Sequence, residues 1–143
     1  MPNWNLEEYR PIKDLITDYV NGLNNRDYKS IAKHLTETCI MAKHCALTGV
    51  SEIINWFANT FENEDCRTLK FELVDASANF FKESESQALL YMQIYKNQQP
   101  QQIHIESLYL VKSDNSWKIN RIFGLGFDSE SHNEYFKPFL LND

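Results

Sequence analysis

The fold of this chain is decided by residues 87–127, which read QALLYMQIYKNQQPQQIHIESLYLVKSDNSWKINRIFGLGF. Three β-rich runs, 87–96, 103–112 and 117–127, are separated by polar clusters of the kind that form turns. A fourth run, 69–81, comes before them. Consecutive strands joined by short turns predict an antiparallel sheet, and strands of this length must twist and curl.

The N-terminal part of the chain has helical periodicity instead. Apolar residues recur there at spacings of three and four: Ile12, Leu15, Ile16, Tyr19, Val20 and Leu23. Pro11 can open this helix and Asn24-Asn25 can end it, while Asp27 can cap a short second helix. A third helix would bury Ile53, Ile54, Phe57 and Phe61. We therefore expect an α+β fold, with three N-terminal helices packed on the concave face of a strongly curved, mainly antiparallel sheet.

Composition and charge exclude several classes of function. The formal net charge of −6, without a basic stripe, argues against nucleic acid and against an anionic membrane surface as partners. We see neither a signal-peptide pattern nor an apolar run long enough to span a membrane. Three cysteines without Cys-x-x-Cys spacing favour reduced thiols in the cytoplasm, and the scattered histidines favour neither a metal nor a cofactor.

The chain is long enough for one domain, which we place at residues 1–127. Residues 128–143 form an extension that is too apolar to be left in water, since it contains Tyr135, Phe136, Phe139, Leu140 and Leu141. We expect this extension to dock over the mouth of a pocket or against a second copy of the chain.

Strand alternation sorts the side chains of the sheet into two faces. We assign the face of Leu90, Leu108 and Ile119 to the concave side, because the helices need an aliphatic surface to pack on. Glu106 and Arg121 fall on the same face. Either they form a buried salt bridge that only organises the core, or they meet a ligand. His104 lies near the start of its strand, either at the mouth of the pocket or on the surface.

The opposite, convex face carries an amphipathic aromatic patch. Its members are Tyr91, Tyr95, Ile105 and Tyr109. Patches of this composition are typical of protein interfaces, so we predict a homodimer that forms through this face.

Several motifs resemble those of the nuclear-transport-factor-2-like superfamily, which includes SnoaL-like cyclases and ketosteroid isomerase. Residues 18–27 look like the first helix and turn of that family, residues 49–57 like its third helix and residues 117–124 like its last strand. The resemblance covers roughly residues 10–127 and implies a cystatin-like cone around a pocket. One fold of this kind hosts many functions.

Laid over the isomerase, Tyr19 falls at the tyrosine of the oxyanion hole and Glu106 at a carboxylic acid that is kept protonated. In that isomerase an apolar site keeps the carboxyl group neutral, so that it can donate a hydrogen bond. The position of the catalytic base, however, holds Lys43 instead of an aspartate. An ammonium group cannot accept a proton, so the resemblance argues against steroid isomerase activity.

Three functions remain open. The first is a pocket for an apolar ligand, either anionic or carbonyl-bearing, which Lys43 and Arg121 would bind through its carboxylate or enolate. The walls of this pocket would be Phe57, Leu90, Met92, Ile94, Leu108 and Phe123. The second is a cofactor-independent isomerase, dehydratase or cyclase that uses Tyr19, Glu106 and His104. The third is a non-catalytic homodimeric interaction module.

Overall fold

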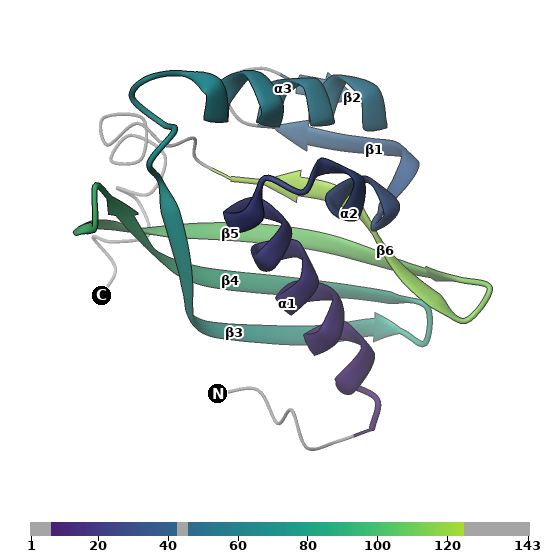
Figure 1. Ribbon diagram of the computed structural model, residues 1–143. Coiled ribbons are helices and arrows are strands. Elements are labelled where there is room, and N and C mark those ends of the chain that lie inside the picture. Colours follow the sequence, from purple (N-terminus) through teal and green to yellow (C-terminus); the bar gives the residue numbers. More distant parts are fainter. Residues whose placement is uncertain (1–6, 43–45, 125–143) are drawn as a thin grey trace.

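Three helices cover one face of a curved, six-stranded sheet in the computed structural model, which describes residues 7–42 and 46–124 (Figure 1). In chain order the elements are α1 (Arg10–Asn25), α2 (Tyr28–Lys33), β1 (Leu35–Ala42), β2 (Ala46–Thr48), α3 (Val50–Glu62), β3 (Lys70–Lys82), β4 (Glu85–Lys96), β5 (Gln99–Ser113) and β6 (Ser116–Phe123). The strand order is β2-β1-β6-β5-β4-β3, and all neighbours are antiparallel except β1 and β6. The predicted α+β class with a mainly antiparallel sheet is confirmed.

Helix α1 forms where the apolar stripe predicts it. Pro11 lies in its first turn, where a missing N–H leaves no hydrogen bond unmade. The whole stripe from Ile12 to Leu23 is buried against the sheet. The helix ends because Arg26 adopts a left-handed conformation, with φ at 55°, and its N–H bonds back to carbonyl groups of the last turn.

The connection between α1 and α2 depends on two residues. The carboxylate of Asp27 accepts a hydrogen bond from the backbone N–H of Ser30 at 3.2 Å, which caps α2 as expected. Gly22 lets the two helices approach closely, because a Cβ atom there would lie 2.8 Å from Cγ1 of Ile31. The close contact fixes α2 beside the C-terminal half of α1.

The concave face of the sheet is the one that the sequence indicates. Leu90, Leu108 and Ile119 have no exposed surface and belong to the core cluster that the helices complete. Along β4, buried and half-buried residues alternate without interruption from Ser86 to Tyr95. The half-buried set, which includes Tyr91 and Tyr95, therefore faces the convex side.

Strand β6 breaks this alternation, and two predictions fail as a result. Tyr109 pairs with Arg121 and Leu110 with Ile119, so Asn120 is an extra residue in a β-bulge. After the bulge Ile122 is buried, whereas Arg121 is exposed and Phe123 is 45% exposed. The predicted inward positions of Arg121 and Phe123 are wrong, because strict alternation ignores the bulge.

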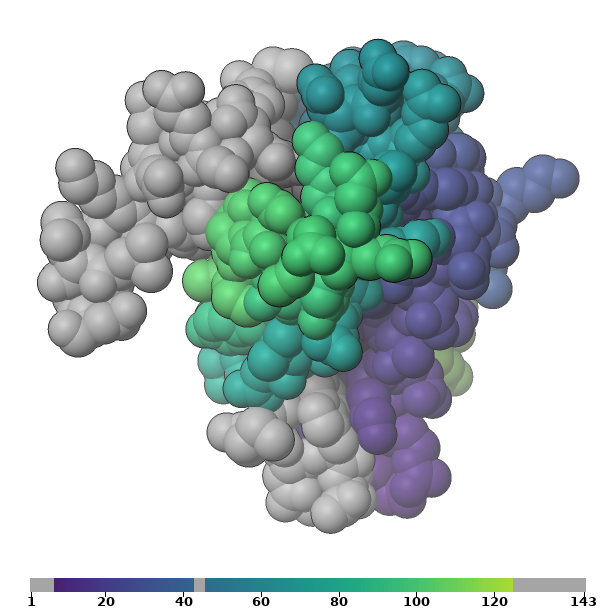
Figure 2. Space-filling model, turned by 60° about the vertical axis from the view of Figure 1, so that its left-hand side comes forward, coloured from purple at the N-terminus to yellow at the C-terminus, as the bar shows by residue number. Residues whose placement is uncertain are grey.

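In Figure 2 the end of the β4–β5 hairpin (green) faces the reader beside the α1–α2 region (purple to blue). Among residues 7–42 and 46–124, no helix combines the length and the apolarity needed to cross a bilayer. The predicted C-terminal extension, 128–143, lies outside the described residues.

Candidate functional site

Tyr19, Glu106 and His104 meet in the interior, between α1 and β5. The hydroxyl group of Tyr19 donates a hydrogen bond to Oε1 of Glu106. The other carboxylate oxygen, Oε2, lies 3.1 Å from Nε2 of His104. Tyr19 and His104 have no exposed surface and Glu106 is 2% exposed. Three titratable side chains, one from the N-terminal helix and two from a strand more than 80 residues later in the chain, thus form one buried hydrogen-bonded network.

Helix and strand geometry explain why these three residues meet. Tyr19 lies in the buried stripe of α1, which packs across the concave face (Figure 1). His104 and Glu106 are two residues apart on β5, so both side chains point to that face. The spacing of His104 and Glu106 is a signal that the sequence contains, although it does not show that Glu106 contacts the histidine.

Apolar side chains surround the network. In the β4–β5 register, Met92 lies opposite His104 and Leu90 lies opposite Glu106. Leu90, Met92 and Leu108 have no exposed surface. Phe57 of α3 is 1% exposed and stacks on Phe61, with their ring centroids 6.1 Å apart. With Ile94, which is 2% exposed, five of the six expected wall residues lie in the interior, where a polar group is costly unless it is hydrogen-bonded.

The burial of Tyr19 determines its protonation state. Desolvation raises the pKa of the Tyr19 phenol well above its ordinary value of 10.0, and the charge and hydrogen bond of Glu106 raise it further. Burial also raises the pKa of the Cys39 thiol, which is fully buried, to about 12. At neutral pH Tyr19 is therefore a neutral hydrogen-bond donor and Cys39 is a thiol.

The carboxylate fixes the tautomer of the histidine. An ionised Glu106 only accepts hydrogen bonds, so the contact with His104 requires a proton on Nε2. In a neutral imidazole the basic nitrogen is then Nδ1. A carboxylate that orients a histidine in this way is the arrangement found behind many general bases.

The expected partnership of Glu106 with Arg121 is not formed in the part of the chain that the structure describes. Arg121 lies on the convex face, beside Tyr109 in the register. The hypothesis of a Glu106–Arg121 salt bridge is therefore wrong, and the alternative surface position of His104 is wrong as well. Lys43 lies outside the described residues.

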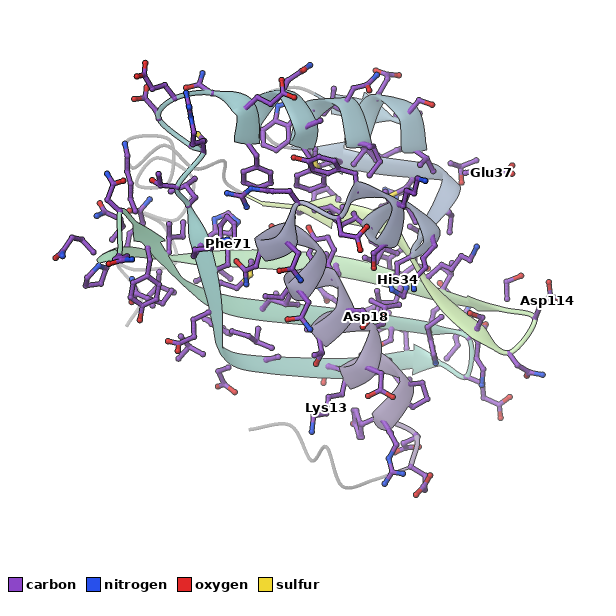
Figure 3. The ribbon with its side chains drawn as sticks, viewed as in Figure 1. Lys13, Asp18, His34, Glu37, Phe71 and Asp114 are labelled. Atoms are coloured by element: carbon purple, nitrogen blue, oxygen red, sulfur yellow. The ribbon has the colours of Figure 1, made fainter. Side chains whose placement is uncertain are left out.

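A second histidine–carboxylate pair, which no pattern in the sequence singles out, joins α1 to the C-cap of α2. Nε2 of His34 lies 3.2 Å from Oδ2 of Asp18 (Figure 3). The Asp18 side chain is 52% exposed, so this pair is at the surface and is weak. Within the described ranges, no group of three histidine, cysteine, aspartate or glutamate side chains is arranged to hold a metal ion.

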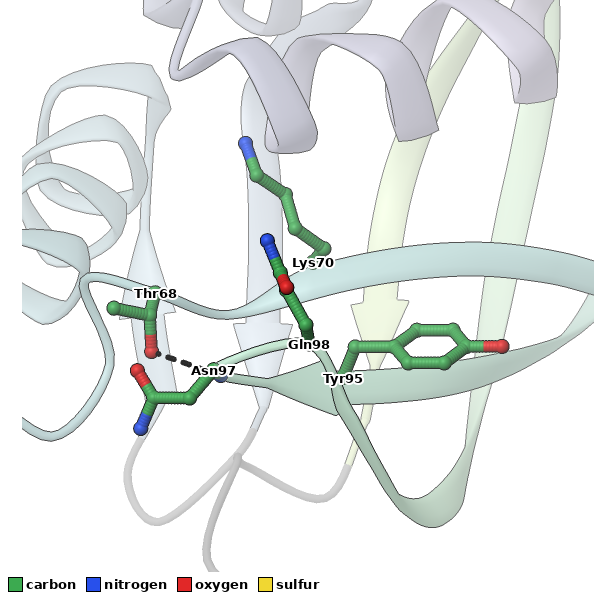
Figure 4. Close-up of a pocket in the computed structure, with 5 residues that line it drawn as sticks. All are labelled: Thr68, Lys70, Tyr95, Asn97 and Gln98. Carbon is green, nitrogen blue, oxygen red and sulfur yellow. Dashed lines mark hydrogen bonds between the residues drawn. The ribbon is translucent and has the colours of Figure 1, made fainter.

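A groove of about 680 Å³ lies at the end of the β4–β5 hairpin (Figure 4). It is lined by Thr68, Lys70, Tyr95, Asn97 and Gln98. Two of its polar groups are already used, because Asn97 N–H bonds to Thr68 Oγ1 at 3.3 Å and Lys70 Nζ bonds to the carbonyl oxygen of Asn24 at 2.8 Å. This groove is separate from the buried network.

Sequence comparison identifies the domain that carries this network. Residues 12–122 match the SnoaL-like domain, a range that runs from the first turn of α1 to the next-to-last residue of β6. The chain belongs to the SnoaL-like family. No curated protein matches the sequence of this SnoaL-like protein.

Solved structures share the fold at low sequence identity. A putative scytalone dehydratase from Novosphingobium aromaticivorans is 18% identical, with a TM-score of 0.67, and the match covers 84% of each chain. Hexachlorocyclohexane dehydrochlorinase LinA-type3 from Novosphingobium barchaimii is 12% identical, with a TM-score of 0.70 over 80% of this chain and 83% of that one. The yeast UBP3-associated protein BRE5 is 14% identical, with a TM-score of 0.68 over 78% and 90%. The fold of this SnoaL-like protein is therefore shared by proteins with very different names, and likeness at this level shows the fold alone.

Proposed function

We propose that this SnoaL-like protein binds a small, mainly apolar molecule in its interior and moves a proton on it, as a cofactor-independent isomerase or lyase. One observation carries the proposal: three titratable side chains form a single hydrogen-bonded network inside an otherwise apolar core. Clusters of buried titratable groups are common at active sites. The names of two enzymes of the same fold are in keeping with this class of reaction.

Each of the three residues would have its own role in the proton transfer. His104, oriented by Glu106, would remove a proton from a carbon atom next to a carbonyl group. The electron pair of the broken C–H bond moves to the carbonyl oxygen, which becomes an enolate. Tyr19 would then turn its O–H from Glu106 to this oxygen, because a neutral donor in a dry site stabilises the developing charge. Return of the proton to a different atom gives an isomer, and loss of a leaving group gives an unsaturated product.

The charges favour a neutral ligand over an anionic one. Arg121, which was expected to bind a carboxylate, is on the outer face. In the described interior the buried acid is Glu106, whose ionised carboxylate repels an anion. A ketone or a similar carbonyl compound fits this environment better than an acid.

The first test is hydrogen exchange at carbon. We expect the protein to accelerate deuterium incorporation from D₂O into 2-tetralone, a small apolar ketone, as followed by NMR. Glu106→Gln turns one of the two acceptor oxygens into an NH₂ donor and removes the charge that stabilises the imidazolium formed on His104, so it should lower the accelerated rate about 100-fold or more. Tyr19→Phe should lower the rate by a similar factor, since it removes one donor to the oxyanion.

The control variant is His34→Gln, which removes the histidine of the surface pair and should leave the exchange rate unchanged. All variants are compared after circular dichroism shows that they are folded. An exchange rate equal to that of buffer, or one that Glu106→Gln does not change, contradicts the proposed proton transfer.

A homodimer is a second proposal, and it concerns the opposite face of the sheet. Tyr91, Tyr95, Ile105 and Tyr109 are all half-buried on the convex face, and Tyr91 lies opposite Ile105 in the register. The bulge in β6 adds Phe123, which is 45% exposed, and Ile103 on β5 is 38% exposed. An exposed apolar patch of this kind supports an interface between two copies of the chain.

The dimer predicts a change of mass in light scattering. We expect the wild-type protein to elute as a dimer at micromolar concentration, and the Tyr91→Lys/Ile105→Lys variant to elute as a folded monomer, because two buried ammonium groups on each side oppose association. Lys29→Glu, on the exposed side of α2, should remain a dimer. A monomeric wild-type protein overturns this proposal and leaves the proton transfer unaffected.

A further inference from the structure

Two neighbouring phenylalanines line one groove at the end of the sheet that carries the β3–β4 turn. Phe80 pairs with Ser86 and Lys82 with Glu85, so Phe81 is an extra residue in a β-bulge. Adjacent residues of a regular strand point to opposite faces, but both Phe80 and Phe81 line this groove of about 570 Å³. Phe81 is 58% exposed, which is unusual for so large an apolar side chain. Bulges that re-aim a side chain are common on edge strands such as β3 and next to active sites.

The floor of the groove is aromatic. Phe80 and Trp117 line the groove with their ring centroids 5.8 Å apart, and Tyr9, which does not line it, packs on Phe80 with the centroids 5.1 Å apart. Trp117 is 7% exposed and belongs to the core, so it gives the groove a fixed base. Pro11 closes the side formed by α1. The groove therefore has rigid apolar walls on β3, β6 and α1.

A cation already lies over this floor. Nζ of Lys112 is 6.0 Å from the centroid of the Trp117 ring, within the range of a cation–π contact. Lys112 is exposed, and its long side chain can leave this position at little cost. The Lys112 ammonium group therefore occupies the position over Trp117 that the cationic group of a ligand would take.

The rim adds negative charge. Glu7, Glu8 and Glu83 line the groove together with Lys82 and Lys112. Lys82 is paired with Glu85 at 3.2 Å, and Glu7 is paired with Arg10 at 3.5 Å. Glu8 and Glu83 form no ion pair with any residue in the described ranges. After these ion pairs are counted, the groove is lined by the two carboxylates of Glu8 and Glu83 and by one ammonium group, that of Lys112, so its net charge is negative.

We propose that this groove is a second ligand site, separate from the buried network, which takes a small organic cation with an apolar body. The substituted ammonium group takes the place of the Lys112 ammonium over Trp117, close to the carboxylates of Glu8 and Glu83. The apolar body packs against Phe80 and Phe81. This site shares no residue with the Tyr19–Glu106–His104 network. A failed test of the proposed reaction would therefore not contradict the proposed cation site, and the reverse also holds.

The probe is benzyltrimethylammonium, with benzyl alcohol and phenylacetate as the neutral and anionic comparisons. Binding is followed by the NMR signal of the Trp117 indole N–H, which is assigned from its absence in Trp117→Phe. We expect a saturable shift with the cation at about millimolar concentration, as befits a solvent-exposed cation–π site. Benzyl alcohol should bind several-fold more weakly, and phenylacetate should give no saturable shift.

Three variants test the individual contacts. Lys112→Met removes the competing ammonium group and should tighten binding about threefold. Glu83→Gln and Phe81→Ser should each weaken binding, and both positions are exposed, so the fold is retained. Glu64→Gln, an exposed acid that does not line the groove, is the matched control and should have no effect. Equal affinity for the cation and the alcohol, weaker binding after Lys112→Met, or no saturable shift with the cation would overturn the proposal.

Discussion

Replacing Glu106 with alanine is expected to lower the free energy of unfolding by about 3 kcal/mol or more, because it removes one partner from a buried polar network. Tyr19 and His104 both bond to the Glu106 carboxylate and are fully buried. In the Glu106→Ala variant their polar atoms lose this partner without gaining water. Since domains of this size are stable by only about 5–15 kcal/mol, the loss is a large part of the total.

The triple variant Tyr19→Phe/Glu106→Met/His104→Leu is expected to behave differently. It removes all three polar groups together and fills the space with apolar side chains of similar size. Such replacements are often neutral or stabilising, so we expect the triple variant to equal or exceed the wild-type protein in stability. If the triple variant is as stable as the wild-type protein, the presence of these three polar residues is better explained by function than by stability.

Urea unfolding followed by circular dichroism measures both variants against the wild-type protein. If Glu106→Ala lowers the free energy of unfolding by less than about 1 kcal/mol, water can reach the polar atoms of Tyr19 and His104 in the variant, which their burial does not indicate. If the triple variant is as unstable as Glu106→Ala, the network is mainly a structural link between α1 and β5. The second result favours the structural interpretation of these residues over the catalytic one.

Stability is also expected to fall in alkali, by about 2.5 kcal/mol between pH 8 and pH 11 from Cys39 alone. The native pKa of Cys39 is about 12, against an ordinary value of 9.0, and the pKa of Tyr19 is also raised. The unfolded chain therefore loses these protons before the native chain does. Between the two pKa values the native state holds more protons than the unfolded state, so the free energy of unfolding decreases as the pH rises. The stabilisation from Cys39 is complete below its unfolded pKa and is lost progressively as the pH rises through its native pKa.

Unfolding in urea at pH 8 and at pH 11 measures this decrease. In Cys39→Ala the decrease should be smaller by about 2.5 kcal/mol, even though the variant starts from a lower stability because its core is less well filled. Cys66→Ala is the comparison: burial also raises the pKa of this half-buried thiol, so the decrease should lie between those of the wild-type protein and of Cys39→Ala. An equal decrease in the wild-type protein and in Cys39→Ala shows that the buried thiol does not titrate as its surroundings imply.

The fold could be predicted because local patterns and tertiary packing agree along most of the chain. The stripe of α1, the cap at Asp27 and the uninterrupted alternation of β4 each fix one element, and each is found where it was expected. The parallel pairing of β1 with β6 was not predicted. It joins segments about 80 residues apart, and neither segment has a sequence pattern that indicates its partner.

The site could be predicted only in part. The inward positions of Tyr19 and Glu106 follow from helical periodicity and from strand alternation. The position of Arg121 does not, since one extra residue at Asn120 reverses every side chain after it. A bulge depends on the pairing of two strands, so neither strand's sequence reveals it. Glu106 therefore bonds to a tyrosine and a histidine, and the arginine that was expected beside it lies on the other face.

The most direct test of an interior ligand site is a crystal structure of the protein grown with 2-naphthol, whose ring and oxygen mimic the enol of 2-tetralone. We predict that its oxygen lies within hydrogen-bonding distance of Tyr19 or His104, with its rings against Leu90, Met92 and Leu108. Naphthol bound only on the outer surface, with the Tyr19–Glu106–His104 contacts unchanged, would contradict the account.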